Sequence, residues 1–185
     1  MYSLKNSGTI QNSFLPLVDE LLSAVQGDPF WENYLMELKT PFSATFSLHL
    51  AIFVEPYLQF ILEGKKTVES RFSSRRFAPY NRVDKGDVVL LKQSSGPIVG
   101  VCQVNYAWFY ELDPESLQTL KKDFAVAICA QDSDFWKQRE AASFATLMRI
   151  ENVKSISPIK FTKRDRRGWV VIHESSSQLE LDLGN

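Results

Sequence analysis

The chain has 185 residues, of which 44% are hydrophobic, and a formal net charge of −1, which fits one domain with an extension better than two full domains. No apolar run approaches the roughly 20 residues of a membrane-spanning helix, and the amino terminus lacks the order of a secretory signal, so we expect a cytoplasmic protein. Two cysteines and two histidines are widely scattered, and the sequence therefore predicts no disulfide framework, metal or cofactor.

Residues 1–41 predict a helical extension ahead of the main domain. Residues 1–12 are polar and aperiodic, so we expect an irregular end there. Apolar residues then recur at helical spacing from Phe14 to Val25, and Asp28-Pro29 is typical of the N-cap and first position of a second helix. We expect the second helix to bury Phe30, Tyr34, Leu35 and Leu38. The two helices either cap the main domain or form a docking surface for another protein.

The main domain, residues 42–174, is predicted to hold about six strands with interspersed short helices. Composition places the strands at 42–55, 67–72, 88–91, 98–108, 144–159 and 169–172. A short helix is expected to end at Gly64, and Asp113-Pro114 and Asp132 begin two more. Because the order is not strictly alternating, we predict an α+β fold built on a small mixed, mostly antiparallel barrel. His49 is expected to be structural, and residues 175–185 to form an acidic tail.

The stretch from Glu63 to Phe72 combines charge, a glycine and strand-forming residues. The two-residue period of a strand places Val68 and Phe72 toward a core. On the opposite, open side it places Thr67, Glu69 and Arg71, with Lys65 and Lys66 at the preceding turn. The sequence thus predicts a mixed-charge pocket beside a helix end, and the alternative is an ordinary solvated strand face.

Positive charge is concentrated in residues 64–92 and 160–167, so the remainder of the chain is acidic despite the balanced total. A basic face on an acidic body is a plausible footprint for a polyanion. The basic residues predicted to contact nucleic acid are Lys65, Lys66, Arg71, Arg75, Arg76, Arg164, Arg166 and Arg167.

One motif resembles a known family. The pattern Tyr57-x-x-x-Ile61-Leu62-x-Gly64-x-Lys66-Thr67-x-Glu69-x-Arg71, followed by Lys85-Gly86-Asp87, is similar to the ASCH domain of the PUA-like group. The resemblance runs from about Leu48 to Ile172, and Arg164–Val171 looks like the family's closing strand. It implies a β-barrel with a cleft beside the motif and a role in binding RNA or other nucleic acid, including in transcription coactivators. By matching the motif, Lys66, Glu69 and Arg71 are implied as cleft residues.

The leading functional hypothesis is a module that binds single-stranded RNA or a modified nucleotide. Lysine and arginine can meet phosphate, whereas a carboxylate such as Glu69 repels phosphate and can accept a hydrogen bond from a base amine. Four aromatic residues either stack on an unpaired base or pack in the core. They are Phe77, Tyr80, Tyr106 and Trp108.

Two alternatives remain open. The first alternative, which the resemblance also implies, is hydrolysis, since some small ASCH proteins are amidohydrolases acting on acylated cytidine and others are described as ribonucleases. The catalytic candidates are Lys66, Thr67 and Glu69, but Glu69 stands where those amidohydrolases have threonine, so their mechanism does not transfer directly. The other alternative is a protein-interaction or coactivator module that works through the leading helices. Exposure of Leu17, Leu21 or Leu38 would favour it, and their burial would count against it.

Overall fold

The computed structural model describes residues 7–40, 44–162 and 167–175, with side chains from Phe14 onward. Its strands are β1 (Leu48–Phe53), β2 (Val68–Ser73), β3 (Val88–Gln93), β4 (Ile98–Glu111), β5 (Phe144–Ile159) and β6 (Trp169–His173). Its helices are α1 (Ser7–Ala24), α2 (Pro29–Met36), α3 (Tyr57–Leu62), α4 (Pro114–Phe124) and α5 (Ser133–Lys137), with a 3-10 turn, η1 (Glu37–Lys39). Arg164, Arg166 and the acidic tail beyond Ser175 lie outside the described residues.

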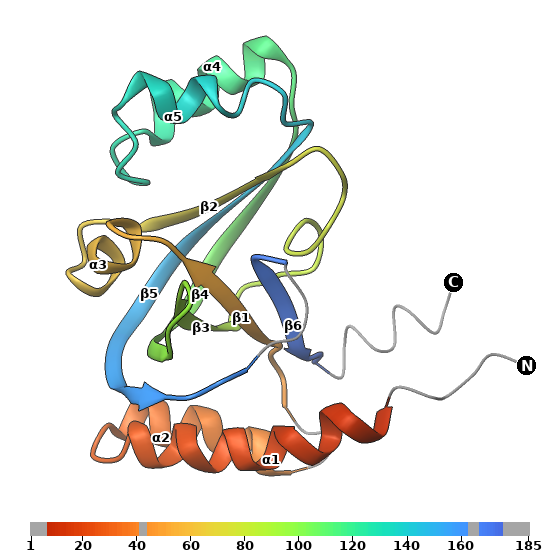
Figure 1. Cartoon of the computed structure of the whole chain (residues 1–185), viewed down its shortest axis with the longest axis vertical. Coiled ribbons are helices and arrows are strands. Elements are labelled where there is room, and N and C mark those ends of the chain that lie inside the picture. The colour runs from red at the N-terminus through yellow and green to blue at the C-terminus, as the bar shows by residue number, and fades with distance from the viewer. Residues whose placement is uncertain (1–6, 41–43, 163–166, 176–185) are drawn as a thin grey trace, which may run out of the picture.

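The six strands form one sheet in the order β2-β5-β4-β3-β1-β6. Among the described strands β1 and β3 pair in parallel, and the other four pairs are antiparallel. The sheet curls into a half-barrel (Figure 1), which confirms the predicted α+β, mostly antiparallel fold. Within the described residues β2 and β6 are not paired with each other, so hydrogen bonds between strands leave the curl open between these two edges.

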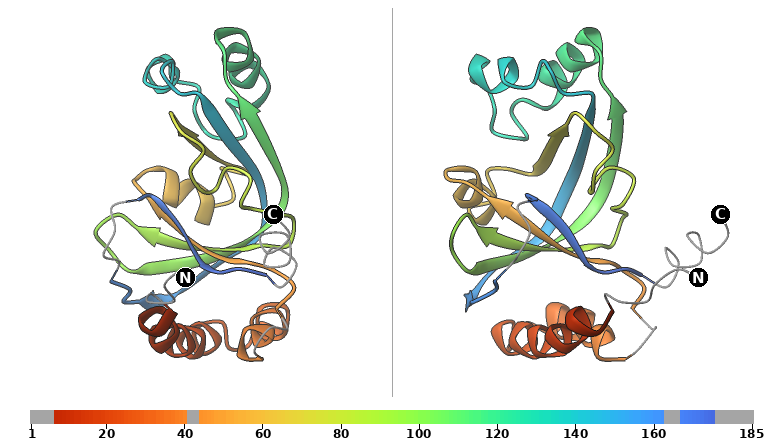
Figure 2. Two further views of the ribbon diagram at one scale, coloured as in Figure 1. Left: turned by 90° about the vertical axis from the view of Figure 1, so that its right-hand side faces the viewer. Right: turned by 45° about the vertical axis from the view of Figure 1, so that its right-hand side comes forward.

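The long strands β4 and β5 connect two helical ends of the molecule. Figure 2 shows α1 and α2 at one end and α4 and α5 at the other, with β4 and β5 running between them. In β4 a side chain at Gly100 would lie 2.8 Å from Leu62 Cδ2, and the register with β5 shifts beside it. The glycine thus permits a close approach of the Leu62 side chain to β4.

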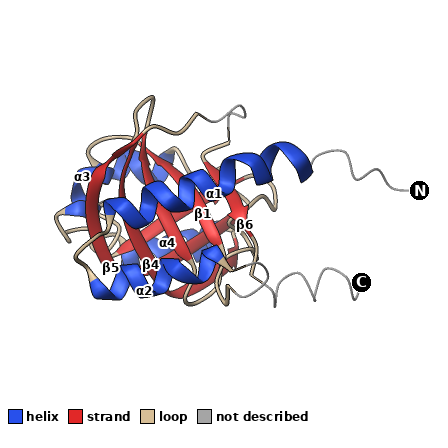
Figure 3. Ribbon diagram, turned by 90° about the horizontal axis from the view of Figure 1, so that it is seen from below, coloured by secondary structure: helices blue, strands red, loops and turns tan. Residues whose placement is uncertain are grey.

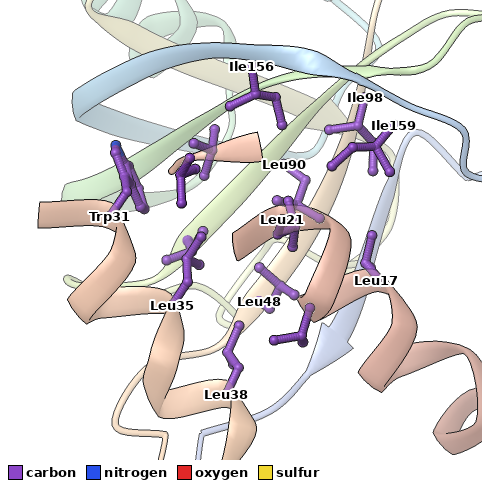
Figure 4. Close-up of a cluster of buried hydrophobic side chains, with 14 of the residues drawn as sticks. Leu17, Leu21, Trp31, Leu35, Leu38, Leu48, Leu90, Ile98, Ile156 and Ile159 are labelled. Carbon is purple, nitrogen blue, oxygen red and sulfur yellow. The ribbon is translucent and has the colours of Figure 1, made fainter. Parts of the chain in front are cut away.

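Helices α1 and α2 lie across the strands (Figure 3) and bury an apolar cluster against them (Figure 4). The cluster includes Leu17, Leu21, Trp31, Leu35 and Leu38, together with Leu48 and Leu90 of the sheet. The two helices therefore cap the half-barrel. Leu17, Leu21 and Leu38 are all buried, which counts against a docking role for that face.

Three expectations for this region were wrong. Helix α1 begins at Ser7, inside the segment predicted to be irregular. In α2 the buried aromatic residue is Trp31, whose Nε1 donates to the Asn152 carbonyl at 3.0 Å, whereas Phe30 is 41% exposed. The first strand begins only at Leu48, because the preceding Ser47 N–H donates to the Asp87 carboxylate rather than to a neighbouring strand.

His49 is buried and hydrogen-bonded through both ring nitrogens. Nε2 lies 2.9 Å from Asp87 Oδ2, and Nδ1 accepts from Trp169 Nε1 at 3.2 Å. The other oxygen of Asp87 binds the N–H of Ser47. The histidine thus joins β1, the turn before β3 and β6, which is the structural role expected of it.

Candidate functional site

A pocket of about 140 Å³ is lined by residues from the end of β1, the start of α3, β2 and α5, together with residues next to them in the chain. Its walls combine three aromatic rings, three cationic side chains, one carboxylate and the hydroxyls of Tyr57 and Ser70. The lining residues are Ile52, Phe53, Val54, Tyr57, Lys66, Glu69, Ser70, Arg71, Phe135 and Arg139. The structure therefore brings Lys66, Glu69 and Arg71 of the motif into one concave site.

The turn after α3 delivers these side chains. Gly64 has φ +72°, and the N–H groups of Lys65 and Lys66 both donate to the Phe60 carbonyl, so the helix ends as predicted and the chain reverses into β2. Along β2, Glu69 and Arg71 are two residues apart and point to the same side of the strand. Glu69 is nevertheless only 5% exposed, so the prediction that it lies on an open strand face was wrong.

Lys66 is a buried ammonium group with three oxygen neighbours. Its Nζ donates to the carbonyls of Val68 at 2.8 Å and Ile128 at 3.2 Å, and lies 3.3 Å from Glu69 Oε2. Burial lowers the pKa of Lys66, and the Glu69 carboxylate opposes this change. Because each ammonium hydrogen has an acceptor in the protein, Lys66 positions Glu69 and has no spare donor for a ligand.

Arg71 closes the gap that strand pairing leaves between β2 and the β1–β6 edge. Its Nη1 and Nη2 donate to the carbonyls of Gly168 at 3.3 Å and Ile52 at 3.1 Å. Its Nε lies 2.7 Å from Glu69 Oε1, within ion-pair distance but not aligned as a hydrogen bond. The guanidinium also lies 4.8 Å from the centre of the Phe53 ring. Arg71 is thus held largely by protein groups.

Glu69 keeps acceptor capacity for a ligand. Each carboxylate oxygen faces one cation, Oε1 toward Arg71 and Oε2 toward Lys66. An ionised carboxylate offers about four acceptor positions, so about two remain after these contacts. The carboxylate is therefore buried, fixed in orientation and able to accept from a donor in the pocket.

A wider groove of about 470 Å³ adjoins the pocket, and the two share Ser70, Arg71 and Arg139. The groove is also lined by Phe72, Ser73, Ser74, Gln138, Ala141 and Ala142. Sequence reasoning missed Arg139, because nothing local marks a residue that follows α5 as a neighbour of β2. Tyr57 is the first residue of the motif, and Phe135 belongs to the short helix predicted to begin at Asp132.

Other predicted contact residues do not line the pocket. Thr67 is exposed and precedes β2, which weakens the assignment of a nucleophile there. Lys65 pairs with Glu63, and Arg76 pairs with Glu111. Arg75 and Arg167 are also exposed, and neither lines the pocket.

The four aromatic residues proposed for stacking also lie away from the pocket. Tyr80 is buried with its ring 5.0 Å from that of Phe144, so it is a core residue. Tyr106 and Trp108 contact each other on β4, with ring centres 4.9 Å apart, and Phe77 is exposed on a loop. The rings that line the pocket are instead Phe53, Tyr57 and Phe135.

None of the described helices is long and apolar enough to cross a bilayer. The same part of the chain contains no group of three or more histidine, cysteine, aspartate or glutamate side chains arranged to hold a metal ion.

Comparison with known proteins decides the family. The model of the ASCH domain matches residues 52–160, more than half of the chain and the whole of the motif. The chain belongs to the ASCH domain family. This match confirms the resemblance seen in the motif. No curated protein matches the chain.

Solved ASCH structures share the fold. The ASCH protein of Zymomonas mobilis is 14% identical, with a TM-score of 0.55 over 74% of this chain and 95% of its own. A serine-to-alanine variant of that protein gives a TM-score of 0.56 over 75% of this chain and 97% of its own, again at 14% identity. At this identity the likeness shows the fold alone, so the chemistry of the ASCH pocket must be argued from its own residues.

Proposed function

We propose that this ASCH domain binds single-stranded RNA by taking one unpaired nucleotide into the pocket, where Glu69 accepts a hydrogen bond from the base. The observation that carries the proposal is the buried Glu69 carboxylate, which Lys66 and Arg71 fix in place while it retains acceptor capacity. The link between the PUA-like group and RNA supports the same ligand class.

The composition of the pocket suits a base attached to an anion. With three cationic side chains and one carboxylate, the pocket carries a net positive charge that attracts a phosphate. The carboxylate repels phosphate but complements the exocyclic amine of adenine or cytosine. The rings of Phe53, Tyr57 and Phe135 provide apolar surface for a base. We therefore expect amine-bearing bases to bind more tightly than bases that lack the amine.

The test compares bases and variants together. Unstructured RNA oligomers rich in adenine or cytosine should lose about 1 to 3 kcal/mol of binding free energy in the Glu69→Gln variant, measured by fluorescence anisotropy. Glu63→Gln is the matched control, because Glu63 is an exposed carboxylate of the same turn, paired with Lys65. It should leave affinity unchanged.

A ligand-side comparison keeps the protein intact. Replacing adenosine by inosine, or cytidine by uridine, should weaken binding to the wild type by a similar amount and have little further effect in Glu69→Gln. If Glu69→Gln instead raises affinity for all oligomers alike, the carboxylate only repels the RNA backbone and the base-reading role is wrong.

Hydrolysis is a second candidate, favoured by two observations. Burial lowers the pKa of Lys66, as a lysine base requires, and the Ser70 hydroxyl lines the same pocket. Against it, the three Nζ contacts of Lys66 are those of an ammonium group, and Thr67 is outside the pocket. If the wild type cleaves RNA or an acylated nucleoside and Ser70→Ala loses that turnover while still binding, catalysis becomes the better account.

A further inference from the structure

We infer that the groove beside the pocket is a phosphate subsite, and that Arg139 binds the phosphate of the nucleotide whose base occupies the pocket. The inference rests on the proposed function and deepens it. Glu69 recognises the base of the nucleotide, and Arg139, which lies outside the ASCH motif, recognises its phosphate.

The pocket and the groove are continuous. They share the side chains of Ser70, Arg71 and Arg139, so a ligand that enters the pocket leaves it over these residues. The groove adds the hydroxyl of Ser74 and the amide of Gln138, whereas the Ser73 hydroxyl already donates to the Arg75 carbonyl, and no acidic residue lines the groove. A phosphate attached to a base in the pocket would therefore meet no carboxylate in the groove.

Arg139 has unused hydrogen-bonding capacity. One of its nitrogens donates to the Phe135 carbonyl, and among the described residues no carboxylate lies within ion-pair distance of the guanidinium. A guanidinium has five N–H donors, so most of them remain available. By contrast, the neighbouring Lys137 pairs with Asp134. Arg139 thus lies at the junction of the pocket and the groove, and among the described residues it has no anion within ion-pair distance.

Protein contacts also hold the Arg139 side chain in position before any ligand binds. Its guanidinium carbon lies 3.3 Å from the centre of the Phe135 ring and 5.5 Å from that of Phe72. Its backbone N–H donates to the Trp136 carbonyl at 2.9 Å. Contact with two rings restricts the side chain, so less side-chain entropy is lost when the guanidinium binds a phosphate.

Partial burial of this cation favours an anionic ligand. The loss of hydration lowers the pKa of the Arg139 guanidinium, and the carboxylate of Glu69 counteracts this only in part. A bound phosphate would supply the missing negative charge through charge-assisted, bidentate hydrogen bonds. Arg71, whose nitrogens already contact protein oxygens, is less suited to this task.

The test separates base binding from phosphate binding. Adenosine and cytidine, each as nucleoside, 5′-monophosphate and 3′-monophosphate, are titrated into the full chain by NMR. For at least one of the two monophosphates the wild type should bind at least tenfold more tightly than the nucleoside, which corresponds to about 1.4 kcal/mol from a charge-assisted contact. In Arg139→Gln that advantage should be lost, so that the monophosphate binds no more tightly than the nucleoside does to the same variant.

Arg76→Gln is the control for general charge, because Arg76 is an exposed arginine paired with Glu111 away from the pocket. It should keep the full advantage of the monophosphate. Urea unfolding of Arg139→Gln checks that its fold is retained, and Arg139→Lys, which keeps the charge but not the bidentate geometry, should retain only part of the advantage.

The outcomes distinguish the two proposals. If nucleosides bind and neither monophosphate binds more tightly, or if Arg139→Gln keeps the advantage, the subsite is wrong and base binding stands. If neither nucleosides nor monophosphates bind, the proposed function is wrong and the subsite with it. If only the monophosphates bind, and Arg139→Gln abolishes this, the subsite is supported and recognition of the base by Glu69 is not.

Discussion

Two regions of the molecule differ in whether charged side chains are buried among the apolar ones. Beneath α1 and α2 the buried cluster is apolar, and it includes Leu21, Trp31 and Leu35 at 1% exposure or less. Beside α3 the sheet buries Lys66 and Glu69, which are 3% and 5% exposed. Burial of apolar area stabilises a fold, whereas a buried ion pair seldom repays its desolvation. We therefore expect the region under α1 and α2 to contribute stability, and the buried charges beside α3 fit the proposed binding role.

Removal of one buried charge should have the largest effect. Lys66→Met takes away a cation 3.3 Å from Glu69 and leaves the carboxylate buried with Arg71 alone. We expect a loss of about 3 to 5 kcal/mol in the free energy of unfolding, measured in urea. Replacing both partners, in Lys66→Met/Glu69→Leu, should cost less than the sum of the single variants. Additive losses would mean that the two charges do not interact and that the site is not an ion-pair network.

Truncation at the apolar end should cost slightly less. Leu21→Ala removes a fully buried side chain from the cluster under α1, and the cavity should lower the free energy of unfolding by about 2 to 5 kcal/mol. Leu15→Ala is the matched control, since Leu15 belongs to the same helix and is 51% exposed. We expect the control to change stability by less than about 0.5 kcal/mol. Equal effects would show that α1 does not hold the half-barrel.

A smaller effect concerns pH. His173 on β6 stacks on Phe14 of α1 with ring centres 5.1 Å apart, and burial lowers the pKa of His173, with Glu174 opposing. Below its ordinary pKa of 6.5 the unfolded chain binds this proton before the folded chain does, so wild-type stability falls as pH falls through this range. His173→Phe keeps the stacking and removes the titration. Its free energy of unfolding, measured in urea, should therefore change less between pH 7 and pH 5 than that of the wild type.

The difference in slope cannot exceed about 1.4 kcal/mol per pH unit, the limit for one proton. If wild type and His173→Phe lose stability in parallel over this range, the histidine is not desolvated against α1.

The sequence predicted what is encoded locally. Asp28, Asp113 and Asp132 cap helices as expected, because a short side chain and its nearby N–H groups decide a cap. Gly64 ends α3 for an equally local reason. The motif likewise brought Lys66, Glu69 and Arg71 to one site through the spacing of a turn and a strand.

What the sequence did not predict depends on tertiary contacts. Glu69 is buried because Lys66 and Arg71 compensate its charge, and a two-residue period cannot reveal which strand face a neighbouring element covers. Arg139 joins the site only because α5 folds back beside β2, a juxtaposition that nothing within either segment encodes. The choice of Trp31 over Phe30 as the buried ring similarly depends on the Asn152 carbonyl of a distant strand.

A crystal structure of the full chain with adenosine monophosphate, taken as whichever phosphate isomer binds more tightly, tests the central claim most directly. We expect the base in the pocket, with its exocyclic amine within hydrogen-bond distance of a Glu69 oxygen, and the phosphate in the groove within hydrogen-bond distance of the Arg139 guanidinium. A nucleotide stacked instead on Tyr106 and Trp108, with the pocket empty, would contradict the account.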